Sequence, residues 1–243
     1  MNFPSAGDYI DIHNHGAKSS SRCFQVENLM THENRFPDNE TGLTYTIGIH
    51  PWFLTNDNYE QQINIVQHLA DHNNLIALGE AGFDRLKGPD IIIQKTAFEN
   101  HVIIAEKVSK PLFIHCVRAW DELLSEHKKL KPTVPWLVHG FRGKKELAMQ
   151  LISKGMYLSF WFDFVIRPEA TSLLKSLPKE RVFLETDGSG ADIKSIYEKV
   201  AADLLLSVDE LKSIIHANFM EIFTPDPLKG NPPAPLGGNS AWD

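Results

Sequence analysis

Two histidines close to the start of the chain could hold a metal ion. The run YIDIHNH, from Tyr9 to His15, places them two positions apart. In a β-strand residues i and i+2 point to the same side, so the imidazoles of His13 and His15 should converge. Converging imidazoles suit a metal, although two ordinary surface histidines would give the same short pattern. The rest of the chain decides between these interpretations.

Metal-binding residue types recur at the ends of later apolar runs. His50 ends TYTIGIH, Glu80 lies late in LIALGEAGF, His115 ends PLFIHC, His139 ends PWLVHGF and Asp187 ends RVFLETD. The other histidines fall in loops or on expected helices, where a solvated side chain is the ordinary interpretation: His32, His68, His72, His101, His127 and His216. The sorting of the first group to strand ends favours a metal site.

Imidazoles and carboxylates without cysteine favour divalent Zn, Mn or Mg over a thiolate site. A tetrahedral catalytic zinc needs only three protein ligands and a water, and this chain offers more. Two ions about 3.5–4 Å apart would use the whole set if one carboxylate bridges them, and Glu80 is the natural bridge. The candidates at these strand ends are His13, His15, His50, Glu80, His115, His139 and Asp187.

The elements that must position these residues alternate along the chain. Eight β-rich runs are separated by helix-compatible stretches, which predicts an α/β fold with a single-domain (β/α)8 TIM-type barrel over residues 1–223. Catalytic residues of such barrels lie at the carboxyl ends of the strands. Gly16–Thr41 is the weakest stretch, because its composition is typical of a loop and its strand, RCFQVEN, is doubtful. Residues 224–243 are rich in Pro and Gly and are expected to form a flexible tail. The expected helices are Asn58–Asn73, Ile91–Ser109, Trp120–Leu130, Lys144–Lys154, Glu169–Ser176, Ile193–Leu206 and Val208–Phe223.

Composition excludes several classes of protein. The chain has 243 residues, 42% of them hydrophobic, and no apolar run approaches the roughly 20 residues of a membrane span. Two cysteines, Cys23 and Cys116, and an N-terminus without signal-peptide character predict a cytoplasmic protein. The formal net charge of −7 repels long phosphate backbones, so a nucleic-acid substrate would be gripped only locally.

Several residues beside the strand ends could bind substrate. Arg118, just after His115, could clamp an anionic group in a bidentate contact. Asp84 and Arg142 share this rim, where a solvated loop residue is the ordinary interpretation. Trp52, Trp120 and Trp161 each follow a strand end, and could stack on a base or pack under loops.

In their order, the motifs resemble those of the TatD family of metal-dependent deoxyribonucleases, which are amidohydrolase-type barrels. The resemblance spans Tyr9 to Phe223 and rests on DIHNH, GIHPW, GEAGFD, FIHC, HGFRG, ETDG and NFMEIF. It implies that His13, His15 and Asp187 hold one metal, that His115 and His139 hold the second, and that Glu80 bridges the two. It also implies that His50 lies near the scissile group. The chain departs from the family in carrying Val117 before Arg118, in lacking a Pro-containing loop after ETDG, and in a short segment between His15 and His50.

These patterns predict a metal-dependent hydrolase that cleaves phosphoester bonds in DNA ends or short single-stranded oligonucleotides. A water activated by two divalent ions would attack, with Asp187 as its base and with His50 and Arg118 holding the phosphate. A hydrolase of a small-molecule amide, lactone or ester is the alternative enzyme, because the same metal pair polarises a carbonyl. A barrel retained only for binding is disfavoured by the complete ligand set. No protein partner is predicted, and the metal stays open among Mg, Mn and Zn.

Overall fold

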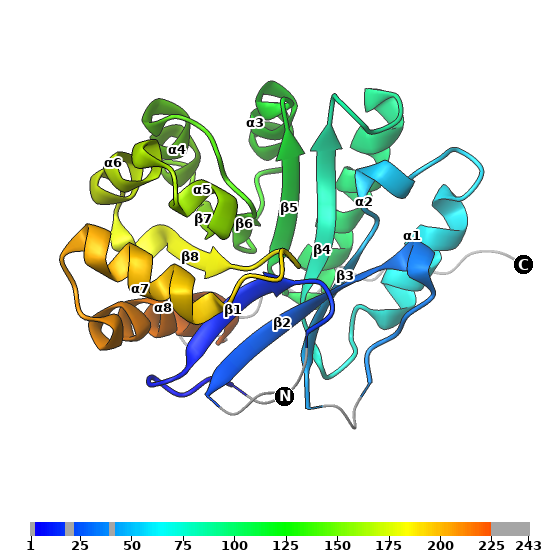
Figure 1. Cartoon of the computed structure of the whole chain (residues 1–243). Coiled ribbons are helices and arrows are strands. Elements are labelled where there is room, and N and C mark those ends of the chain that lie inside the picture. The colour runs from blue at the N-terminus through cyan, green and yellow to red at the C-terminus, as the bar shows by residue number, and fades with distance from the viewer. Residues whose placement is uncertain (1–2, 18–21, 39–41, 225–243) are drawn as a thin grey trace, which may run out of the picture.

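The computed structural model describes residues 3–17, 22–38 and 42–224 (Figure 1). Its eight strands lie side by side in chain order, and each is parallel to the next. They form the nearly closed barrel that the alternating pattern predicts. The strands are β1 (Tyr9–Asn14), β2 (Cys23–Met30), β3 (Thr44–Gly48), β4 (Leu75–Asp84), β5 (Leu112–Val117), β6 (Trp136–Val138), β7 (Tyr157–Trp161) and β8 (Val182–Glu185).

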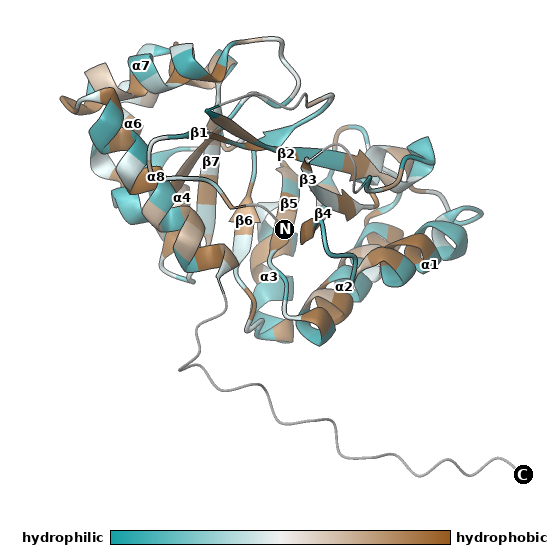
Figure 2. Ribbon diagram, turned by 90° about the horizontal axis from the view of Figure 1, so that it is seen from below, coloured by the Kyte–Doolittle hydropathy of each residue, from teal (hydrophilic) through white to brown (hydrophobic). Residues whose placement is uncertain are grey.

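Helices follow the later strands and cover the outside of the barrel. Figure 2 shows both hydrophilic and hydrophobic residues on these helices, as expected of elements that pack one face on the barrel. The α-helices are α1 (Tyr59–Leu69), α2 (Ile91–Val108), α3 (Trp120–Leu130), α4 (Lys145–Ile152), α5 (Phe162–Val165), α6 (Pro168–Ser176), α7 (Ile193–Leu204) and α8 (Val208–Phe223). The short α5 was not predicted, because four residues are too few to show a helical period. None of the helices in the described ranges combines the length and apolar character needed to span a membrane.

The segment with the weakest pattern is the least regular part of the barrel. The doubtful strand is real, since β2 covers Cys23–Met30, but the described residues contain no α-helix between β1 and β3. Only the 3-10 helix η1 (Thr31–Glu33) follows β2. Too few apolar residues recur at helical spacing here to bury a helix face, which is why the regular strand–helix alternation begins at β3. The predicted tail lies outside the described residues apart from Thr224.

The barrel is completed where β8 returns to β1. The Asp187 backbone N–H, just past β8, donates to the His13 carbonyl at 3.1 Å. The Asp11 carboxylate accepts from the Thr186 N–H at 2.9 Å and from its hydroxyl at 2.7 Å. Burial raises the pKa of Asp11 to about 7, against the opposing effect of the Thr186 hydrogen bonds. These bonds join the first and last strands next to the predicted ligands.

Aromatic side chains form an apolar floor beneath those ligands. The Phe113 ring on β5 stacks 6.3 Å from His13 and lies 6.2 Å from Phe223, measured between ring centroids. Phe223 is the last residue of α8 and packs 4.5 Å from Phe219 of the same helix, so the end of α8 lies beside Phe113. The capping box of Ser207 and Glu210 starts that helix, each side chain accepting from the other residue's backbone N–H. Burial of this floor keeps water from the underside of the site.

Candidate metal centre

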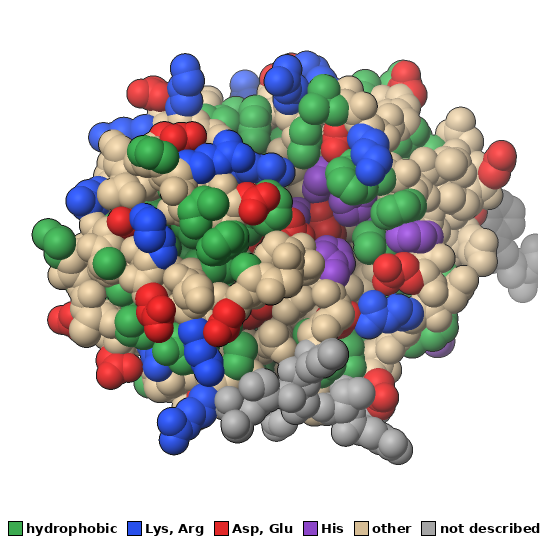
Figure 3. All heavy atoms as spheres, viewed as in Figure 1, with side chains coloured by type: hydrophobic (Ala, Val, Ile, Leu, Met, Phe, Trp, Pro, Cys, Tyr) green, Lys and Arg blue, Asp and Glu red, His purple; other side chains and the backbone are tan. Residues whose placement is uncertain are grey.

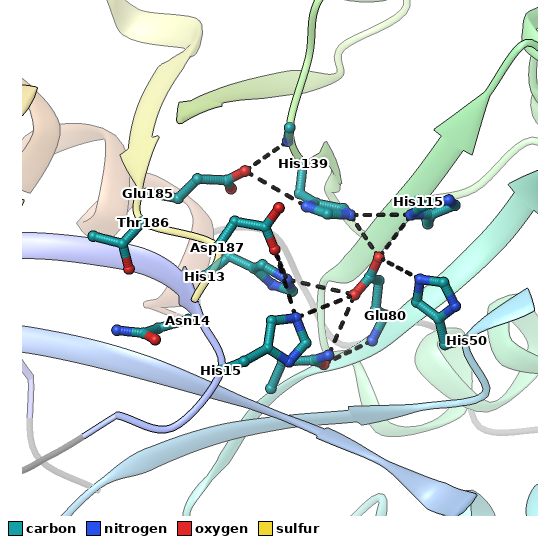
Figure 4. Close-up of polar contacts among 12 residues, drawn as sticks. His13, Asn14, His15, His50, Glu80, His115, His139, Glu185, Thr186 and Asp187 are labelled. Carbon is teal, nitrogen blue, oxygen red and sulfur yellow. Dashed lines mark hydrogen bonds and ion pairs between the residues drawn. The ribbon is translucent and has the colours of Figure 1, made fainter. Parts of the chain in front are cut away.

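Glu80, from β4, lies at the middle of the polar cluster at the carboxyl ends of the strands (Figure 4). Its Oε1 atom is 2.6 Å from His139 Nε2, 2.8 Å from His115 Nδ1 and 3.2 Å from His50 Nε2. Burial by itself would raise the pKa of Glu80, but His139 and the other histidines hold it well below its usual range. The carboxylate is therefore ionised.

The other carboxylate oxygen of Glu80 faces a different group of residues. Oε2 is 3.4 Å from His13 Nε2 and 3.8 Å from His15 Nε2. Asp187 Oδ1 completes this group at 3.6 Å from the Nε2 atom of each histidine. The structure thus brings together every ligand candidate expected from the sequence, and one carboxylate lies between two sets.

The surroundings of His13 fit a divalent ion. Its ring is completely buried, and neither ring nitrogen has a hydrogen-bond partner among the described residues. A buried polar atom without a partner is costly, and a cation beside Nε2 would satisfy it. His13, His15 and Asp187 offer three ligand atoms within 4.8 Å of one another, and His13, Glu80 and His139 offer another such group. The donor set of imidazoles and carboxylates suits Zn, Mn or Mg.

A buried carboxylate orients His115. Asp84 Oδ2 lies 3.1 Å from His115 Nε2, on the side of the ring opposite Glu80. Asp84 also accepts from the Trp52 indole N–H at 2.6 Å and from the backbone N–H of Leu86 and Lys87. Although burial opposes ionisation, these donors lower the pKa of Asp84. The proton of His115 is therefore held on Nε2, which leaves the Nδ1 lone pair facing the centre.

Glu185 lies beside His139 in a similar way, at ion-pair distance. Its Oε1 atom lies 3.5 Å from His139 Nδ1 and accepts from the Gly140 N–H at 2.7 Å. The Ser159 hydroxyl donates to Oε2 at 2.5 Å. Glu185 is fully buried, and its contact with His139 lowers its pKa against the effect of burial. Conversely, and again against burial, Glu80 and Glu185 raise the pKa of His139 well above its ordinary value.

Two features fix the position of Glu80 itself. The Asn28 side chain, from β2, accepts from the Glu80 backbone N–H at 3.0 Å and donates to Oε2 at 3.3 Å. The glycines of GEAGF let β4 lie close to β5. A Cβ atom at Gly79 would meet the Phe113 carbonyl oxygen at 2.3 Å, and one at Gly82 would meet that of His115 at 2.0 Å. Both glycines also have positive φ, so only glycine fits here.

His50 is arranged as a hydrogen-bond donor. Its Nδ1 atom accepts from the Trp52 backbone N–H at 3.1 Å, which places the proton of the neutral ring on Nε2. Burial lowers the pKa of His50 and keeps the ring neutral, although Glu80 acts in the opposite direction. Its Nε2–H therefore points at Glu80 Oε1. This arrangement suits a group that contacts substrate, as expected from the sequence, better than a metal ligand.

A cavity of about 800 Å³ opens above the cluster. Figure 3 shows its histidines and carboxylates at the bottom of a hollow edged by hydrophobic and basic side chains. Arg118 lines the cavity and is exposed, with a left-handed φ of 52° that turns the chain immediately after β5. Arg142 and the three tryptophans expected at the rim, Trp52, Trp120 and Trp161, line it as well. The predicted substrate residues therefore share one cavity with Glu80 and Asp187.

Two interpretations from the sequence were wrong. Asp84 is a buried end of β4 and not a solvated loop residue. His101 is likewise buried, because its Nδ1–H donates to the Ala97 carbonyl at 2.7 Å and its Nε2 accepts from the Ile49 N–H at 3.1 Å. Glu185 was missed altogether, although its position two residues before Asp187 placed it on the same side of the strand.

Parallel strands that carry such a cluster at their carboxyl ends define a class of barrels suited to metal-dependent hydrolysis. The family model described as TatD related DNase matches residues 17–224. The chain belongs to this TatD family of metal-dependent hydrolases.

Individual relatives agree with this assignment. The uncharacterized metal-dependent hydrolase YabD of Bacillus subtilis is 27% identical over 195 residues, which cover 73% of this chain and 76% of the relative. The deoxyribonuclease Tat-D of Schizosaccharomyces pombe is 25% identical over 198 residues, 72% of this chain and 64% of that protein. A crystal structure of a TatD family hydrolase from Entamoeba histolytica superposes with a TM-score of 0.73 at 17% identity, covering 93% of this chain and 100% of that one. This last likeness supports the fold alone.

Proposed function

We propose that the protein is a phosphodiesterase that binds two divalent ions and cleaves DNA ends or short single-stranded oligonucleotides. This proposal rests on where the two carboxylate oxygens of Glu80 point. Oε1 faces His115 and His139, and Oε2 faces His13 and His15. A carboxylate with one oxygen toward each of two histidine groups is suited to bridge two ions. The relative named deoxyribonuclease Tat-D supports DNA as the substrate class.

Each residue of the site would have its own role in hydrolysis. Bound ions would supply an acidified water and neutralise charge on the phosphate. Asp187, the most exposed carboxylate of the cluster at 24%, would orient that water and accept its proton. The neutral His50 would share its Nε2–H between Glu80 Oε1 and a phosphate oxygen, and Arg118 would pair with another phosphate oxygen. The apolar floor around Phe113 excludes water from below and so strengthens these polar contacts.

The alternative, hydrolysis of a small-molecule amide, lactone or ester, calls for the same metal pair but has no use for cations at the cavity mouth. Arg118 and Arg142 both line the cavity, which favours an anionic substrate. The test compares hydrolysis of bis(p-nitrophenyl) phosphate with a lactone panel and an amide panel under Mg, Mn and Zn. Faster turnover of the phosphodiester supports the proposal. Turnover confined to the lactones or amides would overturn it.

A further inference from the structure

Two tryptophan–cation pairs flank the cavity above Glu80. The Lys87 ammonium lies 3.5 Å from the centroid of Trp52, and the Arg142 guanidinium carbon lies 4.9 Å from that of Trp161. Aromatic faces covered by cations are favourable contacts, and both kinds of group also bind nucleic acid. The two pairs differ in what their indole N–H groups do.

The indole of Trp52 is already part of the metal centre's support. Its Nε1–H donates to Asp84 Oδ2 at 2.6 Å, and Asp84 in turn holds His115. Its ring packs edge-on against His50 at 4.8 Å between centroids. Trp52 therefore has no donor to offer a ligand, and its role is to fix the histidines.

The indole of Trp161 has no such task. It ends β7, and its buried Nε1 atom has no hydrogen-bond partner among the described residues. Arg142, exposed beside it, forms no ion pair with an acidic side chain in the described ranges, whereas Arg35 and Arg85 each pair with a glutamate. A flat ring without a role in supporting the metal centre and an unneutralised guanidinium therefore stand together on the cavity wall contributed by β7 and the loop after β6.

We propose that Trp161 and Arg142 bind the nucleotide whose phosphate lies at Glu80, a specificity that rests on the proposed phosphodiesterase function. Trp161 stacks on the nucleobase, and Arg142 pairs with the phosphate. Both residues line the same cavity as Glu80 and Asp187, so one nucleotide spans the two sites. Because every base has a flat face, this subsite selects nucleotides over other phosphoesters without selecting a sequence.

The first test is equilibrium binding to the Mn-loaded protein, which requires no turnover. Thymidine 5′-monophosphate should bind about tenfold more tightly than deoxyribose 5-phosphate, the size of effect expected for one stacked base. Trp161→Leu should bring this ratio close to one. Trp161→Phe, which keeps an aromatic ring and is the safer variant for folding, should retain part of it. Arg142→Ala should weaken both ligands by a similar factor, and Arg142→Lys should restore part of the loss.

Matched controls are Phe36→Leu and Arg167→Ala, which change exposed residues outside the cavity and should leave the ratio unchanged. A wild-type ratio near one, or an unchanged ratio in folded Trp161→Leu and Trp161→Phe, would overturn the subsite. Hydrolysis of bis(p-nitrophenyl) phosphate is measured in parallel. Hydrolysis without base preference rejects the subsite alone, and base preference without hydrolysis rejects the phosphodiesterase proposal.

Discussion

The two sides of Glu80 are built differently. On the side of His115 and His139, each imidazole is backed by its own buried carboxylate, Asp84 or Glu185. On the side of His13 and His15, the carboxylates within ion-pair distance of the rings in the described part of the chain are Glu80 and Asp187, which are themselves ligand candidates. His15 is also 29% exposed, compared with 10% for the His115 side chain. One half of the centre therefore has further carboxylates that orient its rings before an ion binds, and the other half has none among the described residues.

This difference predicts unequal affinities. Rings already fixed in orientation lose less freedom when they bind an ion, so the His115–His139 half should hold its ion more tightly. The more open half lies beside Asp187, where the proposed water is deprotonated. We infer that the His115–His139 half is the more rigid and retains its ion, and that substrate and water exchange at the more open half beside Asp187.

The largest effect is expected from Glu80→Ala, because this carboxylate belongs to both halves. It should remove both ions and lower turnover by at least about 1,000-fold. Metal analysis after gel filtration, together with phosphodiester hydrolysis, measures both effects. Retention of one tight ion together with activity would show that the halves work independently and that the bridge is wrong.

Asp187→Asn should have the next largest effect, because it alters only the open half. The amide keeps a ligand oxygen but cannot accept a proton, so turnover should fall by roughly 100-fold while metal content changes little. Turnover close to that of the wild type would remove Asp187 from the role of base. Asp163→Asn, in an exposed position of α5, serves as the control for the substitution itself.

Asp84→Asn and Glu185→Gln should remove the advantage of the fixed half. Each replaces the charged partner of a histidine without changing its size, and should weaken the tighter ion about 10- to 100-fold. Titration with a competing chelator would then show two ions of similar affinity instead of a tight and a weak one. If the tighter ion is unaffected, the buried carboxylates stabilise the fold and do not tune the metal.

The smallest effect on turnover is expected at His101, which lies outside both halves and supports the segment carrying His50. Burial lowers the pKa of His101 from 6.5 to about 4. As the pH falls, His101 therefore gains a proton in the unfolded chain before it does so in the folded protein. Its contribution to stability is complete above about pH 6.5 and is lost as the pH falls toward 4. Between pH 7 and pH 5 this loss should lower the free energy of unfolding by about 2 kcal/mol.

Urea unfolding at several pH values tests this prediction. His101→Gln can still accept from Ile49 and donate to Ala97, and should flatten the acid side of the stability profile relative to the wild type. The exposed His68→Gln should not. An unchanged acid side in His101→Gln would mean that other groups govern the loss of stability in acid.

Much of the barrel and of the metal centre could be predicted from sequence because both follow from strand alternation. Residues at strand ends share one edge of a parallel sheet, so His13, His115 and Asp187 could be grouped without coordinates. Their supporting partners could not be assigned in the same way. Asp84 on β4 contacts His115 on the neighbouring β5, and Asn28 on β2 contacts Glu80 on β4, with β3 between them. These contacts depend on the register and curvature of the sheet, which no local sequence pattern indicates. His101 resembled a solvated helix residue because its acceptor role depends on how α2 packs against β3.

The junction of β1 and β8 makes the catalytic pocket part of the barrel's own closure. His13 and Asp187 are candidate ligands of one ion, and their backbones are hydrogen-bonded to each other at 3.1 Å. An ion bound by both side chains would therefore also hold the first strand against the last. Chelation should then loosen the ring at one place, so that amide hydrogen exchange quickens at Asp187 and along β1 while β4 and β5 stay protected. Loss of the ions would then be detectable as a local loosening of the barrel. A protease that cuts near β1 would cleave the metal-free protein faster than the metal-bound one.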